Sequence, residues 1–507
     1  MSTDKAKHIA YLLQSVDAYP HAVEGEIEVI ETHISWVILA GDYAYKIKKP
    51  IRNSFLDYTT LELRKHFCEA ELRLNQRFAE ELYLGVVAIV DNNGRLLVGG
   101  PGEPIEYAVK MKRFPSDALL LDRLSHGFVT LIDVRRLARR IADFHQVAAQ
   151  AEPSSRFGAP DLVYQEALDN IREIEASNIA RLSDTLPLLQ QWAADHYATH
   201  VEKFQSRKMG GHIRECHGDL HLGNIVEWNN ALVPFDGIEF CDEFRWIDTL
   251  SDAAFTAMDF VAHGRSDYYH SFINAYFEAT GDYGSIPVLQ WYLVYRAMVR
   301  AKVAAVRFSQ TESNPHAHSQ AEVDVATLVS LAQRLTEADK ARPSLCITHG
   351  VSGSGKTTGS EQVVQRHGAI RICADVERKR LVGLKPNDRF SKGDERVASL
   401  YTDEMKTRTY QRLAELAEEL IQAGTSVVVD ATFLVKGQRL LFRDLADRLK
   451  VPFHILAFNA EPETLRQRVV DRSLANQDAS DADLAVLESQ VQRQQPLDED
   501  ELKLTIP

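Results

Sequence analysis

The chain has 507 residues and a formal net charge of −14 at pH 7, with 45% hydrophobic and 26% charged residues. This length exceeds what one hydrophobic core supports, so two or three domains are expected, and the acidic balance argues against a general nucleic-acid-coating role. The five cysteines form no CxxC pair, the start lacks the pattern of a secretory signal, and no apolar run is long enough for a membrane span, so we expect a cytoplasmic protein.

The segment from about residue 25 to 112 is predicted to form a small lobe of strands and one helix. Extended runs predict strands at 27–30 and 35–39, and period-two alternation predicts a strand at 43–48. A hairpin around the turn at 91–94 predicts strands at 83–90 and 95–98, and a further strand is expected at 107–111. Between the third and fourth of these strands, helical spacing of apolar residues predicts a long helix from about 59 to 82.

Helical spacing then predominates from about residue 115 to 335 and predicts a helical lobe. A polar stretch at 336–343 predicts a linker. Beyond it, short apolar runs alternate with helical stretches, which is typical of a doubly wound parallel sheet. These runs lie at 345–348, 369–372, 426–429 and 453–458. We therefore expect an α/β multidomain protein with domains at 1–335 and 344–507.

The first motif is His-Gly-Asp-Leu-His-Leu-Gly-Asn at 217–224, followed by Phe-Asp-Gly at 235–237. Metal-assisted phosphoryl transfer needs one carboxylate that receives the proton of the acceptor hydroxyl, and an amide and a second carboxylate that bind Mg²⁺ against the phosphates. Asp219, Asn224 and Asp236 have the residue types and the order for these roles. The alternative is a polar turn between helices, because Asp and Asn are common turn residues.

On these residues, the region from about 25 to 335 resembles the aminoglycoside-phosphotransferase branch of the protein-kinase-like fold. The resemblance implies that Asp219 is the catalytic base and that Asn224 and Asp236 are the metal ligands. It also implies that Asp248 is a structural acid that packs behind the catalytic loop.

In the small lobe, the same resemblance implies that Lys46 contacts the α- and β-phosphates of ATP and pairs with Glu71. Lys48 lies on the same face of the predicted strand, and Glu62 and Glu69 are alternatives to Glu71. Two features depart from the family. No GxGxxG run is present, and the family's third motif is only loosely matched by Phe-Asp-Gly-Ile-Glu-Phe at 235–240. A catalytically degenerate lobe that binds nucleotide and regulates the C-terminal domain is therefore the alternative.

The second motif is Gly-Val-Ser-Gly-Ser-Gly-Lys-Thr at 350–357. It follows the strand predicted at 345–348 and leads into a helix, which is the context of a P-loop. Its glycines let backbone amides surround the β-phosphate, and its threonine binds Mg²⁺ at the start of the helix. Lys356 neutralises the β- and γ-phosphate oxygens and is expected to act in catalysis. We expect the nucleotide to be bound by Gly350, Val351, Ser352, Gly353, Ser354, Gly355, Lys356, Thr357 and Thr358, with Thr357 on the metal.

Further carboxylates and arginines follow the P-loop. Asp375, at the predicted end of the second strand, would activate an acceptor hydroxyl, and Arg378 would hold an acceptor anion or fix that carboxylate. The alternative for Asp375 is a helix N-cap. Asp430 ends the third strand and would bind Mg²⁺ through water as the Walker-B acid. Three arginines have the helical spacing of a lid over the phosphates or of a solvated helix face, namely Arg466, Arg468 and Arg472.

Together these residues make the region 344–495 similar to small P-loop kinases of the Zeta-toxin, polynucleotide 5′-kinase and gluconate-kinase neighbourhood. The resemblance implies that Asp375 is the base, Arg378 the acceptor-side arginine, and the lid arginines transition-state stabilisers. Residues 371–396 carry eight Lys or Arg against five acids, which is +3 within a chain of −14. If they line the acceptor crevice, the acceptor is anionic, such as a nucleotide, a nucleotide-sugar, a sugar acid or a nucleic-acid end. The alternative is an ordinary mixed-charge surface.

These motifs predict an ATP- and Mg²⁺-dependent phosphotransferase with two nucleotide-binding modules, each of which moves the γ-phosphate of ATP to a hydroxyl of a small acceptor. The fused order resembles that of bacterial proteins described as phosphotransferase-like with a C-terminal ATPase module. The competing hypothesis is a P-loop kinase or ATPase regulated by a catalytically degenerate kinase-like domain.

Overall fold

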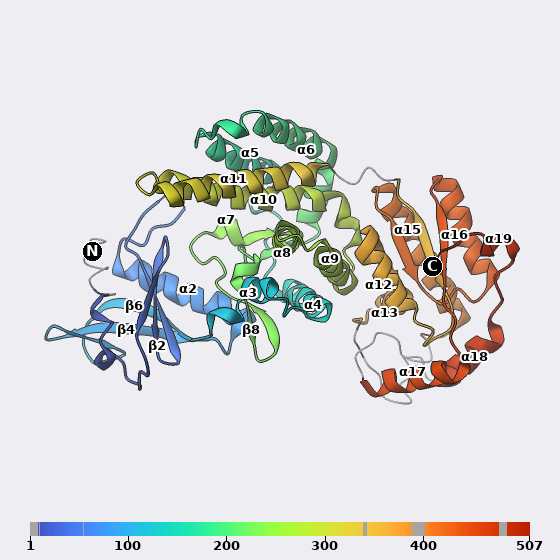
Figure 1. The fold of residues 1–507 in the computed structure, drawn as a ribbon, viewed down its shortest axis with the longest axis horizontal. Coiled ribbons are helices and arrows are strands. Elements are labelled where there is room, and N and C mark those ends of the chain that lie inside the picture. Colours follow the sequence, from blue (N-terminus) through green and yellow to red (C-terminus); the bar gives the residue numbers. More distant parts are fainter. Residues whose placement is uncertain are drawn as a thin grey trace. The chain divides into compact units, whose positions relative to one another are not determined.

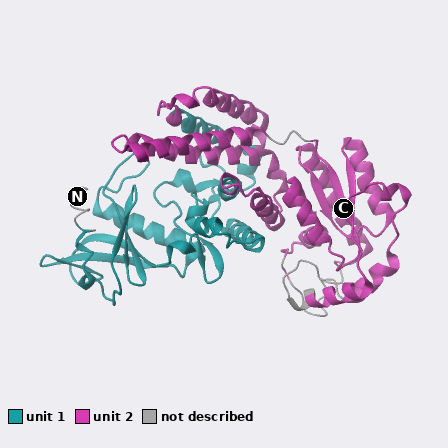
Figure 2. Ribbon diagram, viewed as in Figure 1, with its two compact units in different colours: residues 1–172, 204–259 teal, residues 173–203, 260–507 magenta. Residues whose placement is uncertain are grey.

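The protein is described by a computed structural model that covers residues 9, 11–53, 55–337, 342–386, 388, 400, 402–475 and 484–506. It divides into two compact units (Figure 2). Unit 1 comprises residues 1–172 and 204–259, and unit 2 comprises residues 173–203 and 260–507. The linker predicted at 336–343 lies partly outside the described residues, so that domain boundary stays a prediction.

Unit 1 contains a six-stranded antiparallel sheet in the order β1-β2-β3-β6-β4-β5 (Figure 1). The predicted strands are confirmed as β1 (Glu28–Glu31), β2 (Ser35–Ala40), β3 (Tyr43–Lys48), β4 (Tyr83–Asn92), β5 (Arg95–Val98) and β6 (Pro104–Lys112). Helix α2 (Leu61–Ala79) packs against β4 and β6. It begins after Thr60, whose hydroxyl accepts a hydrogen bond from the amide of Leu63 at 3.2 Å.

The alternation along β3 divides its side chains between the two faces of the sheet. Tyr45 and Ile47 are buried in a core that includes Trp36. Lys46 and Lys48 point to the opposite face and reach α2. Period-two alternation thus places two buried cations in front of one helix.

The rest of unit 1 combines helices with two small antiparallel sheets, which pair β7 with β10 and β8 with β9. The motif at 217–224 lies between β7 and β8, where it includes the short 3-10 helix η4. The elements are α3 (Leu120–Ser125), α4 (Leu131–Val147), β7 (Ile213–Glu215), η4 (Leu222–Asn224), β8 (Ile225–Trp228), β9 (Ala231–Pro234), α7 (Asp242–Arg245) and β10 (Trp246–Asp248). Helices with residues in both units are α5 (Pro160–Glu175), α6 (Thr185–Met209) and α8 (Thr249–Ala262).

Unit 2 contains a five-stranded sheet, parallel throughout, in the order β12-β13-β11-β14-β15. Its strands are β11 (Leu345–His349), β12 (Ile370–Cys373), β13 (Val427–Asp430), β14 (Phe453–Ala457) and β15 (Thr505–Ile506). The first four confirm the predicted apolar runs, whereas the two-residue β15 is too short for a periodic pattern. Because β12 is at the edge of the sheet, one side of its backbone needs partners from outside the sheet.

The helices of unit 2 lie on both sides of the predicted linker in the sequence. Before the predicted linker lie α9 (Ser266–Thr280), α10 (Ile286–Gln310) and α11 (Pro315–Thr336). After it lie α12 (Lys356–His367), α13 (Ala374–Arg380), α15 (Asp403–Gln422), α16 (Lys436–Leu449), α17 (Pro462–Ala475), α18 (Leu484–Arg493) and α19 (Glu499–Leu502). Of these helices, α9, α12, α13, α15 and α16 contact strands of this sheet. Among the described residues, none of the helices combines the length and the apolar character that a membrane crossing requires.

Candidate active sites

The two lysines of β3 share one glutamate of α2. Lys46 Nζ lies 2.9 Å from Glu71 Oε1, and Lys48 Nζ lies 2.8 Å from Glu71 Oε2. Burial by itself would raise the pKa of Glu71, but the two lysines hold it at about 2. Glu69 instead faces Lys65 on the exposed side of α2, at 3.7 Å. The choice that the sequence left open is therefore settled in favour of Glu71, with both lysines as its partners.

Each lysine also binds a carboxylate of the segment that follows β9. Lys46 Nζ donates to Asp236 Oδ1, and Lys48 Nζ donates to Glu239 Oε1. The hydroxyl of Tyr58 donates to the same oxygen of Glu239. The side chains of Lys48 and Glu239 are almost completely buried, whereas that of Asp236 is 40% exposed. Lys48 thus anchors the segment from inside the lobe, and Lys46 holds the carboxylate that remains accessible.

The loop between β7 and η4 presents Asp219 and Asn224 side by side. Asn224 Nδ2 donates to Asp219 Oδ2 at 3.0 Å and to the Asp219 carbonyl oxygen at 3.0 Å. His217 is buried, which lowers its pKa, and the neutral ring accepts from the Asp219 amide at 3.3 Å through Nδ1. Gly218 has a φ of 88°, and a Cβ there would lie 2.6 Å from the Phe244 carbonyl oxygen. The close approach of that backbone explains the glycine at the centre of the motif.

Asp236 is held by backbone conformation and by two neighbours as well as by Lys46. Its φ is 61°, in the left-handed region that Asp and Asn tolerate better than most residues. Its amide donates to Tyr83 Oη at 3.1 Å, and the amide of Gly237 donates to Asn75 Oδ1 at 2.8 Å. Asn224 turns its amide nitrogen toward Asp219, so its amide oxygen and the Asp236 carboxylate are the atoms suited to Mg²⁺. The donor set in unit 1 fits a magnesium ion.

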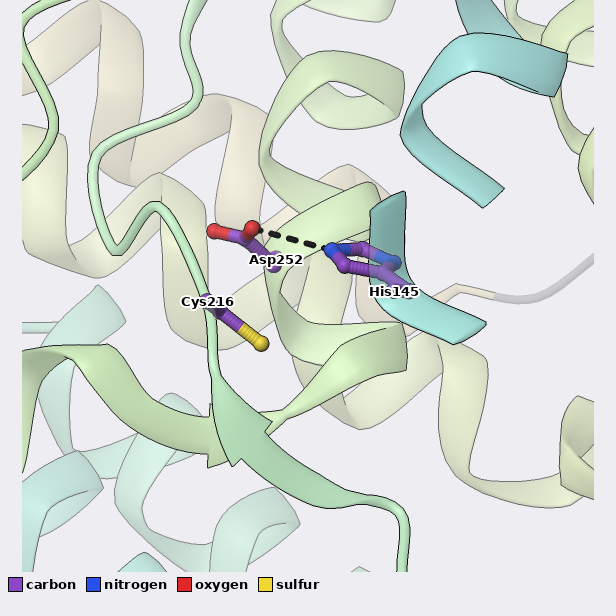
Figure 3. A group of neighbouring side chains, drawn as sticks. All are labelled: His145, Cys216 and Asp252. Atoms are coloured by element: carbon purple, nitrogen blue, oxygen red, sulfur yellow. Dashed lines mark hydrogen bonds and ion pairs between the residues drawn. The ribbon is translucent and has the colours of Figure 1, made fainter. Parts of the chain in front are cut away.

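Behind this loop lies a buried group formed by His145, Cys216 and Asp252 (Figure 3). Asp252 accepts from the amide of His217 at 3.0 Å and from that of Gly218 at 2.9 Å, and its Oδ2 lies 3.1 Å from His145 Nε2. Both carboxylate oxygens are therefore already used to hold the loop. The group supports the catalytic loop and does not fit a metal site.

This arrangement corrects one expectation. The acid that packs behind the loop is Asp252 on α8, and not Asp248 as the family resemblance implied. Asp248 instead forms a buried bidentate ion pair with Arg207, with both bonds at 2.7 Å. Asp248 is the last residue of β10, and Asp252 lies four residues later in the first turn of α8, so sequence spacing alone could not distinguish them.

In unit 2, the P-loop joins the end of β11 to the start of α12. Gly350, Gly353 and Gly355 have φ values of 152°, 80° and 102°, which side chains rarely adopt. A Cβ at Gly350 would also lie 2.5 Å from the Phe458 carbonyl oxygen. Lys356 Nζ donates to the Val351 carbonyl oxygen at 2.8 Å and so spans the loop. This backbone geometry with the N-terminus of α12 forms a cradle suited to phosphate.

Asp430 ends β13 beside the start of α12. Burial raises its pKa, although Arg371, Lys356 and the Thr357 hydroxyl favour the charged form. Its Oδ2 lies 3.4 Å from Ser360 Oγ and 3.7 Å from Arg371 Nη1. The Thr357 hydroxyl and the Asp430 carboxylate are oxygen donors, so this donor set also fits Mg²⁺.

The remaining candidates of unit 2 are brought together only in part. Asp375 and Arg378 form an ion pair at 2.7 Å. Asp375 lies in the first turn of α13, and not at the end of a strand as predicted, because β12 ends at Cys373. On α17, Arg468 Nη1 donates to the Gly353 carbonyl oxygen at 3.2 Å, whereas Arg466 pairs with Glu463 on the exposed side at 3.4 Å. The side chain of Arg472 lies outside the described residues.

Several cations of the basic stretch at 371–396 are bound within the fold. Arg371 Nη2 lies 2.6 Å from Glu278, Lys379 Nζ donates to the Asp388 carbonyl oxygen at 2.9 Å, and Arg380 donates to Glu377. Residues 389–399 lie outside the described residues. The positive balance of this stretch therefore overstates the charge that it offers to an acceptor.

Sequence reasoning named Lys48 only as an alternative to Lys46, from its position on the same strand face, whereas both lysines belong to the site. It missed Glu239 and Asp252 as parts of the first site. Glu239 is the acid of the loosely matched third motif, Phe-Asp-Gly-Ile-Glu-Phe at 235–240. The departure from the family pattern therefore contains the residue that pairs with Lys48.

The AAA domain family model (AAA_33) matches residues 345–497. Uncharacterized protein Rv2004c of Mycobacterium tuberculosis is 31% identical over 467 residues, which span 92% of this chain and 90% of that protein. Uncharacterized protein Mb2027c of Mycobacterium bovis has the same identity and coverage.

Solved structures similar to this chain include a choline/ethanolamine kinase family protein from Mesorhizobium loti. It is 10% identical and covers 66% of this chain and 100% of its own, with a TM-score of 0.34. A putative aminoglycoside phosphotransferase from Ralstonia eutropha is 14% identical and covers 65% of this chain and 98% of its own, with a TM-score of 0.35.

The predicted fold class is confirmed. The parallel sheet and the matched AAA domain form the P-loop part. The antiparallel lobe, whose lysines meet Glu71 and the segment beside the Asp219 loop, has the arrangement of a protein-kinase-like fold. The combination of a kinase-like and a P-loop part indicates a phosphotransferase.

Proposed function

The chain belongs to the same family as protein Rv2004c of Mycobacterium tuberculosis, and we propose that it is an ATP-dependent phosphotransferase with two nucleotide-binding modules. Each module transfers the γ-phosphate of ATP to a hydroxyl of a small acceptor. The observation that carries the proposal is the convergence, within unit 1, of Lys46 and Asp236 with the loop that bears Asp219. The second module is supported by the positive-φ glycines of the P-loop, which leave room for a phosphate group among backbone amides.

In unit 1, Asp219 receives the proton of the acceptor hydroxyl. The amide of Asn224 holds the carboxylate of Asp219 in place, and Lys46 contacts the α- and β-phosphates in the orientation set by Glu71. Asn224 and Asp236 hold Mg²⁺, which neutralises charge on the phosphates when it is bound. Since the base, the lysine with its glutamate and both oxygen ligands are all present, an active site is favoured over a degenerate one.

In unit 2, the P-loop amides and Lys356 bind the β- and γ-phosphates, and Thr357 with Asp430 holds Mg²⁺. Asp375 is the base of this module, and its ion pair with Arg378 fixes the position of its carboxylate. Arg468 lies at the P-loop carbonyl of Gly353 and, of the two lid arginines whose side chains are described, is the one placed to approach the transferred phosphate. The acceptor is small, and for this module we propose an anionic one, such as a nucleotide or a nucleic-acid end, with Arg378 as the cation that would meet its charge.

The test uses the full chain and two single variants, Asp219→Asn and Lys356→Ala. Each is assayed for ATP turnover and for phosphate incorporation into a broad metabolite mixture. We expect each variant to lose a different set of phosphorylated products, by about 10²–10⁴-fold. A loss that occurs only with Lys356→Ala would instead support a P-loop kinase or ATPase regulated by the kinase-like part, and turnover unchanged in both variants would contradict the proposal.

A further inference from the structure

The edge strand of the P-loop sheet is covered by a helix that precedes the predicted linker. Asn274 on α9 donates from Nδ2 to the Ala369 carbonyl oxygen at 3.1 Å and accepts from the Arg371 amide through Oδ1 at 2.7 Å. One carboxamide thus pairs with the edge of β12 as a neighbouring strand would. At the end of α9, the Glu278 carbonyl oxygen accepts from Arg380 Nη2 at 2.7 Å, which satisfies a terminal carbonyl of the helix.

Next to this contact, α9 supplies a charge to the interior of the P-loop part. Arg371 points from β12 between two carboxylates, with its Nη2 at 2.6 Å from Glu278 Oε2 and its Nη1 at 3.7 Å from Asp430 Oδ2. A third acid, Glu361 on α12, lies 3.7 Å from the same Nη1. The side chains of Arg371, Glu278 and Asp430 are 11%, 10% and 5% exposed, so water screens these charges little.

The distances show how the guanidinium is shared. Arg371 makes a short, charge-assisted hydrogen bond with Glu278 and only a longer electrostatic contact with Asp430. An arginine stays charged at every pH at which the protein is folded, so its position, and not its protonation, determines how much positive charge Asp430 experiences. A guanidinium bound to the Asp430 carboxylate would compete with Mg²⁺ for the same oxygen atoms.

We propose that Glu278 is a positioning residue of the P-loop site, which holds Arg371 away from Asp430 and thereby keeps that carboxylate available to Mg²⁺. The inference rests on the proposed function, since it assumes that Thr357 and Asp430 bind the metal of a bound nucleotide. It makes the metal affinity of the P-loop depend on the docking of α9 against β12. Helix α9, which sequence patterns assign to the N-terminal domain, is then part of the C-terminal site.

The test measures nucleotide binding by calorimetry on the full chain, with ATP in EDTA and with ATP during a MgCl₂ titration. All proteins carry Lys46→Met to weaken binding in unit 1, and the heat that disappears in an added Lys356→Ala variant identifies the P-loop site. We expect Glu278→Gln to weaken the apparent Mg²⁺ affinity at that site about tenfold and to leave metal-free ATP binding unchanged. The matched control is Asp267→Asn on the same helix, whose carboxylate pairs with Arg265 and is 40% exposed.

Two further variants separate positioning from general damage. Arg371→Gln should retain or tighten Mg²⁺ affinity, and the double variant Glu278→Gln/Arg371→Gln should recover the affinity that Glu278→Gln loses. Three results would each overturn this inference and leave the proposed function intact. They are an equal loss of Mg²⁺ affinity in Glu278→Gln and in the double variant, weaker Mg²⁺ binding by Arg371→Gln, and a change in Mg²⁺ affinity below twofold in Glu278→Gln. If the protein with intact Glu278 and Lys356 shows no Mg²⁺-dependent binding at the P-loop, the proposed function fails, and the inference fails with it.

Discussion

The two candidate sites hold their charges in different ways. In unit 1 the site is made of side chains, in which two lysines of one strand are bound by Glu71, Asp236 and Glu239. In unit 2 the phosphate cradle is made of backbone, shaped by glycines with positive φ at the start of α12. The first design depends on complete pairing of buried charges, and the second depends on the absence of Cβ atoms. Substitutions should therefore damage the two units through different residue types.

The largest effect is expected from Lys48→Met in unit 1. The change leaves Glu239 buried without its cation, and loss of one partner of a buried pair costs about 3–5 kcal/mol of unfolding free energy. Urea denaturation followed by fluorescence measures it. Lys65→Met, which removes an exposed pair with Glu69, is the control and should cost less than about 0.5 kcal/mol. Similar stability of the two variants would show that Lys48 is not needed to hold Glu239.

A backbone change should act most strongly on unit 2. Gly350→Ala forces a side chain onto a φ of 152° and toward the Phe458 carbonyl oxygen, at a cost of about 1–3 kcal/mol. We expect ATP binding at the P-loop to weaken by about tenfold to a hundredfold, measured by calorimetry with the Lys46→Met background. The matched control is Gly437→Ala, because a Cβ at that position meets no atom within 4 Å. Wild-type affinity in Gly350→Ala would refute a cradle shaped by this backbone.

The support behind the catalytic loop offers a smaller effect that belongs to unit 1 alone. Asp252→Asn replaces an acceptor of two backbone amides by a group with only one accepting oxygen, so one buried amide loses its partner at about 1–3 kcal/mol. We expect kcat of the Asp219-dependent activity to fall about tenfold with KM for ATP unchanged. The products that depend on Lys356 should not change. A loss confined to KM would place Asp252 in nucleotide binding instead of loop support.

The smallest effect concerns acid stability in unit 2. His196 on α6 packs against Trp192 and Trp291, with ring centroids 4.7 Å and 5.9 Å away, and burial lowers its pKa from 6.5 to about 4. The folded-state pKa of His196 is below its unfolded value, so the unfolded chain takes up the proton first as pH falls. The stabilising contribution of the neutral ring to the free energy of unfolding is therefore complete above pH 6.5 and is lost as pH falls toward 4. His196→Phe should reduce the loss of stability between pH 7 and pH 5, by less than about 2 kcal/mol. Melting curves at both pH values measure it, and an unchanged acid sensitivity would exclude His196 as its source.

Local patterns were sufficient wherever neighbouring residues act together. Extended and alternating runs predicted the six-stranded sheet, and short apolar runs predicted four strands of the parallel sheet. The spacing of Asp219 and Asn224 predicted two groups that the structure brings within hydrogen-bond distance. The P-loop is local as well, because its function depends on consecutive backbone amides before a helix. Such features depend on chain geometry over a few residues, which the sequence alone determines.

Tertiary structure decided every choice between residues of the same kind. Glu71 rather than Glu69 faces the lysines because of the rotation of α2 against the sheet, and Asp252 rather than Asp248 meets the loop because of the packing of α8. The contact of Glu278 with Arg371 joins residues 93 positions apart across a predicted linker, so no local pattern could indicate it. Buried charges in this protein pair with residues that are distant in the sequence, and only the folded structure brings the two partners together. The motifs could therefore be predicted from the sequence, whereas the residues that support them could not.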